Sequence, residues 1–362
     1  MSQAPAHRFS WLQRYPLLGP LFGLSFVLVL FEIMVTSDRH MNFLSPDTLG
    51  LILLQTVSVA TGTLGMTLII VSGGIDLSAG SVCALTGVIA GCILRSHHSS
   101  WLAAAGAIAV GGLVGLINGS IIARFAMMPF IVTLGMMGAA RGVAKWVSDN
   151  QSVNFNDLGQ TDGLNALMNN PSIVDPASVP HWLFRFFSTF MSPDPDQVGS
   201  LVVPLWVPTQ GVLIVLVLTI IMSLVLNRSV FGRHIFALGS NEDTARLCGL
   251  RTRMLKVGVY VLSGCFIGLS GVFDLSRLRQ GDPTTAMGRE LDIIAAVVIG
   301  GASLNGGVGS IWGAVIGALT MTSLRSGVVQ MGWPSYIQDI IIGVVIVLAV
   351  GVDKFRSRSL KG

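Results

Sequence analysis

Residues 49–81 read LGLILLQTVSVATGTLGMTLIIVSGGIDLSAGS, and this stretch decides the fold class. Its first part, 49–71, is an apolar run without a charge. The run is long enough for a membrane helix, which needs about 20 such residues. Gly73-Gly74 then ends the run, and a second apolar run begins at residue 78. Two apolar runs with a short polar break between them predict neighbouring helices of a membrane bundle.

Similar runs recur along the whole chain. We expect about ten transmembrane segments, at 17–35, 49–71, 78–94, 101–122, 128–147, 211–226, 256–275, 291–303, 308–324 and 336–352. The run at 291–303 is too short for a straight span, so it indicates a broken or re-entrant element. The predicted fold is an all-α polytopic membrane helix bundle that forms one domain over 1–362.

The composition agrees with a membrane protein. Of the 362 residues, 52% are hydrophobic and 11% are charged, against roughly 25% charged in an ordinary soluble domain. A soluble enzyme, a disordered protein, a disulfide scaffold and a nucleic-acid binder are therefore poor descriptions. P-loop, zinc-protease and hydrolase-elbow motifs are absent, and no His lies inside a predicted span. We expect no catalytic residue, no metal site, no cofactor and no nucleic-acid partner.

The few charges are sorted between the loops. Segment 148–207 has six acidic residues and one basic residue, whereas segment 227–256 has six basic and two acidic residues. Lys and Arg accumulate in cytoplasmic loops. We therefore expect both termini and 227–256 in the cytoplasm and 148–207 outside. Ten spans agree with this orientation, and so would eight.

Glycines recur at four-residue spacing in the predicted spans. The series are Gly111, Gly115 and Gly119, then Gly264 and Gly268, then Gly309, Gly313 and Gly317. Small residues let the backbones of membrane helices approach closely. These series predict tight helix packing and carry no information about a substrate.

Polar residues interrupt the apolar background in three islands. In the first, Asp76 or Ser78 either caps the helix that follows Gly73-Gly74 or faces a cavity, and capping is the favoured interpretation. In the second, a short helix is expected from Asn241 to Gly249, with Glu242 and Asp243 in its first turn. In the third, an acidic pair is followed by a glycine-rich break that is typical of a re-entrant element. Its marked residues are Glu290, Asp292, Gly300, Gly301 and Ser303.

Taken together, the islands resemble the permease subunits of bacterial ABC importers of the ribose/xylose/autoinducer-2 type. The resemblance covers nearly the whole chain. It rests on Gly-Gly-Ile-Asp-Leu-Ser at 73–78, on 231–249, on Glu-Leu-Asp-Ile-Ile-Ala-Ala at 290–296, and on Gly-Gly-Ala-Ser-Leu-x-Gly-Gly-x-Gly-Ser at 300–310. Thr244 and Cys248 depart mildly from the family pattern.

The resemblance implies a permease in the inner membrane of a bacterium that imports a monosaccharide and is not itself an enzyme. Its expected partners are the lipid bilayer, a second permease copy (identical or related), a periplasmic sugar-binding protein and a separate ATPase. The cytoplasmic loop 227–256 would couple to that ATPase through Phe231, Gly232, Arg233, Gly239, Asn241, Glu242, Ala245, Arg246 and Gly249. The translocation path or its structural breaks would involve Gly73, Gly74, Asp76, Ser78, Glu290, Asp292, Gly300, Gly301 and Ser303.

The segment 164–203 is longer than the family pattern leads us to expect. We interpret it as a surface loop with a short interfacial helix around 181–187, and an accessory contact for the binding protein is the alternative. The main alternative for the whole chain is an ion-coupled secondary sugar transporter with Asp76 as its intramembrane acid, and Glu32, Asp274 and Asp339 lie nearer the span ends. A channel or an intramembrane enzyme fits less well. The identity of the sugar stays open.

Overall fold

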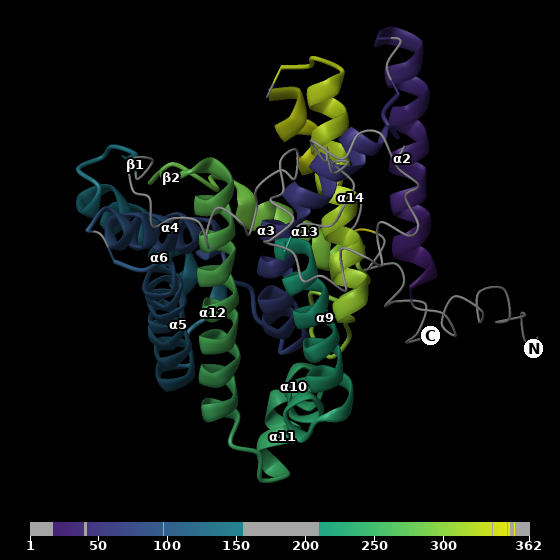
Figure 1. The fold of residues 1–362 in the computed structure, drawn as a ribbon. Helices are drawn as coiled ribbons and strands as arrows, with labels where there is room; N and C mark the ends of the chain where they lie inside the picture. The colour runs from purple at the N-terminus through teal and green to yellow at the C-terminus, as the bar shows by residue number, and fades with distance from the viewer. Residues whose placement is uncertain are drawn as a thin grey trace, which may run out of the picture.

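The computed structural model describes residues 17–39, 42–96, 98–154, 210–334, 336–345, 347 and 351. The predictions for the segment 164–203 and for the two chain ends therefore lie outside the described residues. Within them the chain is almost entirely helical (Figure 1). Its helices are α2 (Leu18–Arg39), α3 (Pro46–Val71), α4 (Ala79–Arg95), α5 (Ser100–Phe125), α6 (Pro129–Val147), α9 (Gln210–Arg228), α10 (Val230–Ser240), α11 (Glu242–Leu247), α12 (Thr252–Leu278), α13 (Arg289–Ile299) and α14 (Ile311–Gln330).

Six of the described helices are long and apolar enough to cross a membrane, namely α2, α3, α5, α6, α9 and α12. α4 and a helix at Tyr336–Val345 are apolar but shorter. The structure therefore confirms an almost entirely helical bundle with six candidate membrane spans among the described residues. The number of about ten segments stays a prediction.

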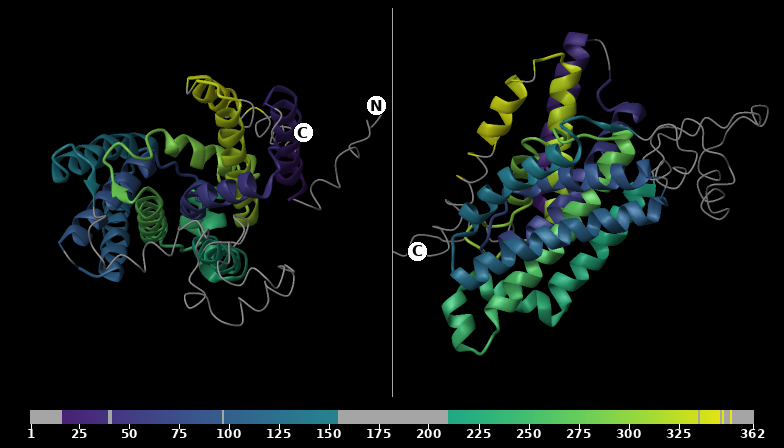
Figure 2. Two further views of the ribbon diagram at one scale, coloured as in Figure 1. Left: turned by 45° about the horizontal axis from the view of Figure 1, so that its top comes forward. Right: turned by 90° about the vertical axis from the view of Figure 1, so that its left-hand side faces the viewer.

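α3 is the central helix of the bundle. In its most apolar window 89% of the residues are buried, compared with 17% in α2 and 22% in α6. α12, α13, α14 and α9 all pack against α3. α4, α5 and α6 lie on one side of the bundle, and α2 and α14 lie on the other (Figures 1 and 2). Ser45 begins α3 by accepting a hydrogen bond from the Thr48 N–H, and Pro46 follows at a position that needs no donor.

The glycine series bring helix backbones into contact, as predicted. A Cβ atom added to Gly111 of α5 would lie 2.2 Å from the carbonyl oxygen of Gly264 of α12. A Cβ atom on Gly115 would lie 2.1 Å from the carbonyl oxygen of Tyr260. On the other side of α3, a Cβ atom on Gly317 of α14 would lie 1.9 Å from the carbonyl oxygen of Ala296. Side chains at these positions would force the helices apart.

α13 is the short element predicted at 291–303. It has 11 residues, which corresponds to about 16 Å of helix, against roughly 30 Å for the hydrocarbon core of a membrane. The chain then turns at Gly300 and Gly301 and returns along α13 as α14. Residues 289–330 thus form a half-helix followed by a longer helix.

Two short strands depart from the purely helical prediction. β1 (Val153–Asn154) pairs antiparallel with β2 (Gln280–Gly281), with Val153 opposite Gly281. A Cβ atom on Gly281 would lie 2.8 Å from the carbonyl oxygen of Gly87, so this strand also packs directly on α4. The pair connects the chain after α6 to the loop between α12 and α13.

Candidate functional site

A cavity of about 350 Å³ lies among α3, α12, α13, α14 and the helix at Tyr336–Val345. Its volume is in the lower part of the range for small-molecule sites, about 300–1,000 Å³. The polar residues that matter most in its wall are Gln55, Arg277, Arg289, Asp292, Arg325 and Gln330. Because polar side chains gather in the wall of this pocket in an otherwise apolar bundle, it is the first candidate for a substrate site.

Three polar contacts join α3 to α14 along one wall of the cavity. Gln330 Nε2 donates to Thr48 Oγ1 at 2.9 Å, and Ser326 Oγ donates to Gln55 Oε1 at 3.4 Å. The hydroxyls of Thr56 and Thr322 are 2.6 Å apart. These side chains hold the two helices together through groups that can also exchange hydrogen bonds with a polar ligand.

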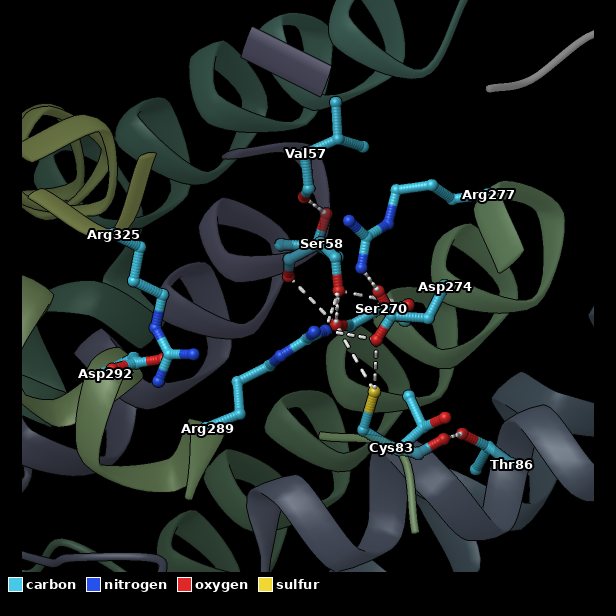
Figure 3. A network of polar contacts seen from close by, with 12 residues as sticks. Val57, Ser58, Cys83, Thr86, Ser270, Asp274, Arg277, Arg289, Asp292 and Arg325 are labelled. Carbon is cyan, nitrogen blue, oxygen red and sulfur yellow. Dashed lines mark hydrogen bonds and ion pairs between the residues drawn. The ribbon is translucent and has the colours of Figure 1, made fainter. Parts of the chain in front are cut away.

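Ion pairs hold the beginning of α13 from both sides (Figure 3). Arg289 pairs with Asp274 of α12 and donates to Ser58 Oγ of α3 at 2.6 Å. Arg325 Nη2 of α14 lies 2.8 Å from Asp292 Oδ2. The two carboxylates are 4% exposed. Buried charges need such partners, because an unpaired charge would be strongly destabilising. The half-helix is therefore fixed to α3, α12 and α14 at the cavity wall.

Asp274 is shared between two guanidinium groups. Its Oδ1 atom is 3.7 Å from Nη2 of Arg277, which lies one helical turn further along α12. Figure 3 shows Arg277 and Arg289 converging on this carboxylate. Cys83 Sγ also donates to Asp274 Oδ2, at 3.3 Å. Within the described part of the chain, Arg277 therefore shares its carboxylate with Arg289.

The first motif island lies away from this cavity. Asp76 Oδ1 accepts hydrogen bonds from the Ser78 N–H at 2.8 Å and from the Ser78 hydroxyl at 2.5 Å. Asn118 Nδ2 of α5 donates to the same hydroxyl at 3.1 Å. Asp76 is 3% exposed and does not line the cavity. It closes the turn before α4. The N-cap residue of α4 is Ser78, which makes no side-chain capping hydrogen bond, so the predicted cap is not formed.

Glycines from all three islands meet at the Val71 end of α3. The Gly307 N–H donates to the Val71 carbonyl oxygen at 2.8 Å. A Cβ atom on Gly239 of α10 would lie 1.8 Å from the same oxygen, and one on Gly306 would lie 2.6 Å from the Gly239 carbonyl oxygen. Gly73 follows directly, with a φ of +84° that favours glycine. We call Gly73, Gly239, Gly306 and Gly307 the glycine junction.

The second island forms two helices where the sequence predicted one. α11 has the expected design: Asn241 accepts from the Thr244 N–H at 2.9 Å, and Glu242 and Asp243 occupy the first turn. Gly249 follows the helix with a φ of +85°. α10, which contains Phe231, Gly232, Arg233 and Gly239, was not predicted as a helix. Its signal was Ser229, which accepts from the Gly232 N–H at 3.0 Å and begins α10.

α11 lies at the end of the molecule opposite the strand pair (Figure 1). Ala245 faces inward at 5% exposure, whereas Leu247 is 86% exposed. Glu242 Oε2 is 2.7 Å from Lys256 Nζ of α12, which fixes the orientation of α11. Arg246 pairs with Asp243 within the same helix at 3.0 Å. α11 is therefore a short, anchored helix with a protruding apolar side chain.

The third island is divided between two locations. Asp292 lines the cavity, whereas Glu290 lies against α4, where a Cβ atom on Gly80 would be 2.2 Å from Glu290 Oε2. Gly300 packs against Gly313 at the turn into α14. Ser303 lies in the same turn, where its carbonyl oxygen accepts from the Gly306 N–H at 3.0 Å.

Of the predicted site residues, only Asp292 reaches the cavity. Four polar residues of the wall were not predicted from the sequence, namely Arg277, Arg325, Gln55 and Gln330. Their signal was present, since a polar residue within an apolar run is a functional hypothesis by default.

Comparison with known proteins places these features in one family. The model of the family described as "branched-chain amino acid transport system / permease component" matches residues 48–350. The ribose import permease protein of Escherichia coli strain K12 is 37% identical over 329 residues, which are 91% of this chain and 92% of that protein. The L-arabinose ABC transporter permease protein of Azospirillum brasilense is 32% identical over 315 residues, covering 87% of this chain and 82% of that protein. The fructose import permease protein of Rhizobium meliloti is 31% identical over 346 residues, covering 95% and 87%.

No solved structure matches the chain at a significant level. The family match, by contrast, extends from α3 to the last described helix. The resemblance that the motif islands predicted is confirmed, and the chain belongs to the permease-component family of branched-chain amino acid transport systems.

Proposed function

We propose that this chain is the membrane-spanning permease subunit of a bacterial ABC importer that carries a monosaccharide into the cell. One observation carries the proposal: similarity to a ribose import permease extends over 91% of the chain. Relatives whose names give L-arabinose and fructose are similar over comparable lengths. The importer would lie in the inner membrane, with the lipid bilayer around its apolar helices.

In the proposed topology about ten segments cross or enter the membrane, both termini are cytoplasmic, and 148–207 is a periplasmic insertion. α13 is the re-entrant segment among them. The Pro46 end of α3 and the cavity then belong to the outer half of the membrane, and α10 and α11 lie at the inner face. This orientation is supported by the basic residues of 227–256 and the acidic residues of 148–207.

α11 is the proposed contact with the ATPase, which would be a separate chain. An isolated helix of six residues is unstable in water. Here Asn241 caps it and the Glu242–Lys256 pair anchors it. Leu247 protrudes and offers an apolar side chain to a groove on a partner. Two further proposed coupling residues, Gly232 and Gly239, support this helix because they allow α10 to pack closely against α9 and α3.

The cavity is the proposed site on the translocation path. Its volume of about 350 Å³ suits one small ligand, and its wall offers both donors and acceptors of hydrogen bonds. Asp292 lies in this wall, whereas Gly73, Gly74, Asp76, Ser78, Glu290, Gly300, Gly301 and Ser303 form the breaks that shape the helices around it. A second permease copy would complete the path, and a periplasmic binding protein would deliver the sugar.

The glycine junction offers a route from the ATPase to the path. It joins α10 to the end of α3 and to the loop between α13 and α14. ATP binding can drive transport only if the ATPase binds two states of the permease unequally. A movement of α11 would then reach both α3 and the half-helix that carries Asp292.

The test is uptake by proteoliposomes that contain the full-length permease. Radiolabelled ribose, arabinose and fructose are supplied together with the binding protein and the ATPase encoded beside the permease. We expect uptake of a sugar that requires all three proteins and ATP. Uptake that proceeds without the ATPase, driven by a proton or sodium gradient, would replace this proposal with the ion-coupled secondary transporter.

A further inference from the structure

Arg141 is a charged residue inside an apolar helix that is long enough to cross a membrane, and it does not line the cavity. It lies on α6, which ends at Val147, and the helix between the two residues is about 9 Å long. A charge at this depth is costly and marks a functional residue by default, with its partners as the guide to its role. The carboxylates that attract its charge, those of Glu290 and Asp282, lie at the two ends of one loop.

The hydrogen-bond partners of Arg141 are backbone carbonyl groups of this loop, 282–288, which connects β2 to α13. Its Nη1 atom donates to the Pro283 carbonyl oxygen at 2.8 Å and to the Thr285 carbonyl oxygen at 2.9 Å. Irregular backbone at membrane depth needs such partners, because lipid offers none. The side chain of Arg141 is therefore bonded to the main chain of the loop.

The loop has a conformation that its surroundings impose. Ala286 has a φ of +59°, in the left-handed region where a residue with a side chain stays only when neighbouring contacts hold it. Arg141 binds the carbonyl group just before it. On the other side, a Cβ atom added to Gly80 of α4 would lie 2.4 Å from the Ala286 carbonyl oxygen. Asp282 accepts from the Thr284 N–H at 2.7 Å and stabilises the loop from within.

The shape of the loop determines where the half-helix α13 begins. The Ala286 carbonyl oxygen accepts from the Arg289 N–H at 3.2 Å, so the first residue of α13 is bonded to the loop. Arg289 pairs with Asp274 and lines the cavity. Asp292, which also lines the cavity, lies in the first turn of the same helix. A displacement of the loop would therefore shift both cavity residues together.

A second contact joins α6 to the same loop. β1, which follows α6, pairs with β2, which precedes the loop, and Asn154 lies opposite Gln280. Val153 of β1 is 2% exposed, so this strand is well packed. We call Arg141, β1 and β2 the outer clamp. Because its two contacts connect the same two parts of the chain, the end of α6 and the start of α13 move together.

We propose that the outer clamp positions the half-helix for transport, and that Arg141 is its positioning residue. A movement at the outer face, where the binding protein would dock, reaches the cavity through Arg141 and the loop 282–288. The inference rests on the proposed function and adds a regulated element at the outer side. α6 packs against α4 and α5, and the clamp gives it a direct connection to the chain that enters α13.

Hydrogen exchange of the full-length permease in phosphatidylcholine nanodiscs tests the contact itself, without a binding protein, an ATPase or a sugar. In Arg141→Gln we expect the amides of 284–291 to exchange at least about tenfold faster, because the loop opens locally. α5 and α14 should exchange as in the wild type. Unchanged exchange in 284–291 would show that Arg141 does not hold the loop, and faster exchange in all helices would reduce its role to general stability. Either result overturns the inference.

Uptake by proteoliposomes that contain the binding protein and the ATPase tests the consequence. Arg141→Gln should lower the maximal rate by about fivefold or more. The concentration of loaded binding protein that gives half-maximal uptake should stay unchanged, because the partly buried Arg141 acts through the loop. A normal maximal rate, or a change confined to the half-maximal concentration, would contradict the positioning role.

Two further variants serve as matched comparisons. Arg141→Lys keeps the charge but loses the planar fork of donors, so we expect it to retain part of the maximal rate. Lys145→Gln removes an exposed cation one turn further along α6, and it should exchange and transport as the wild type does. An equal loss of uptake in Lys145→Gln would show that the effect comes from the charge of α6 and not from the clamp.

The two proposals fail separately. If the wild-type permease imports sugar with ATP and Arg141→Gln imports it equally well, the importer stands and the outer clamp falls. If the wild type imports no sugar under any combination of partners, the proposed function is wrong. The exchange measurement then still decides whether Arg141 holds the start of α13.

Discussion

At the Pro46 end of α3 the helix contacts its neighbours through polar side chains, whereas at the Val71 end it contacts them through backbone atoms. The first end has Thr48 bonded to Gln330 beside a cavity. The second end has the Val71 carbonyl oxygen bonded to Gly307 and directly covered by Gly239. Side chains can change rotamer and exchange partners while the helices stay in place. Backbones in direct contact can only move together, so the two ends suit different tasks: exchange of a ligand and transmission of movement.

Among the substitutions considered, Gly239→Ala should have the largest effect, because it disrupts the backbone contact at the Val71 end of α3. The added Cβ atom would lie 1.8 Å from the Val71 carbonyl oxygen and 2.6 Å from the Gly307 nitrogen. Both neighbours are backbone atoms, so α10 has to separate from α3. We expect ATP-dependent uptake to fall by at least about tenfold while the protein still inserts into the membrane.

Gly138→Ala is the control for this change. Gly138 lies on α6, where nothing is within 4 Å of an added Cβ atom. Uptake by this variant should equal that of the wild type. If Gly239→Ala also transports normally, the glycine junction does not transmit movement.

At the cavity, removing one member of a buried ion pair should have the next largest effect. Asp274→Ala would leave Arg289 and Arg277 facing each other without a carboxylate. Breaking a buried pair in this way costs roughly 3–5 kcal/mol. We expect a clear fall in the midpoint of thermal unfolding in detergent.

A double substitution separates charge from volume at this site. Asp274→Leu combined with Arg289→Met removes both charges of the direct pair but leaves Arg277 without a carboxylate, so it should recover part of the lost stability. Asp38→Ala removes a carboxylate that is 61% exposed beside Arg39, and it should leave the midpoint unchanged. An equally small shift for Asp274→Ala would mean that this pair does not hold α13.

Exchanging the two charges of an ion pair that anchors α11, near the Val71 end of α3, tests whether this helix must keep its orientation. The expected effect on uptake is smaller than those above. Glu242→Lys would place two positive charges together, since Glu242 Oε2 and Lys256 Nζ are 2.7 Å apart. Glu242 is about half exposed, so the pair contributes at most about 1 kcal/mol. We expect uptake to fall several-fold because α11 loses its orientation. Adding Lys256→Glu should restore part of the uptake, and a double variant as inactive as the single one would contradict this positioning role.

The smallest effect is expected where a single hydrogen bond is removed beside the cavity. Thr56→Val and Thr322→Val each remove one of the hydroxyls that lie 2.6 Å apart. We expect each to cost about 1 kcal/mol. The double variant should cost less than the sum, because the two side chains share one contact. Exact additivity in thermal unfolding would show that the contact between these two hydroxyls contributes nothing.

The sequence predicted most of the fold because the positions of membrane helices depend mainly on the lengths of apolar runs. Apolar length located the helices to within a few residues, and α3, predicted at 49–71, spans Pro46–Val71. Glycine spacing predicted close helix packing, and the structure shows it between α5 and α12, where an added Cβ atom would meet backbone atoms. α10 was missed because its residues look like a basic cytoplasmic loop until Ser229 is recognised as its cap.

The site was less predictable, because pairing depends on how helices are rotated against one another. Glu290 and Asp292 are two residues apart, yet one faces α4 and the other faces the cavity. Asp274 was noted as an acid near a span end, but its partner Arg289 comes from another element. Asp76 was singled out because of its motif, but its carboxylate accepts a hydrogen bond within its own turn. Spacing along the chain reveals which groups share a helix, and it says nothing about which helices face each other.

The glycine junction also has a consequence for how such a transporter can change over generations. Three stretches of sequence meet there through main-chain atoms, so a replacement in any of them disturbs the other two. The cavity wall is less restricted away from its ion pairs, because groups such as Gln55 and Ser326 are side chains on helices whose backbones stay intact. New cargoes can therefore arise by ordinary replacements in the wall of the cavity. Such replacements leave the contacts of the glycine junction in place, so the binding site can change while α10 stays joined to α3.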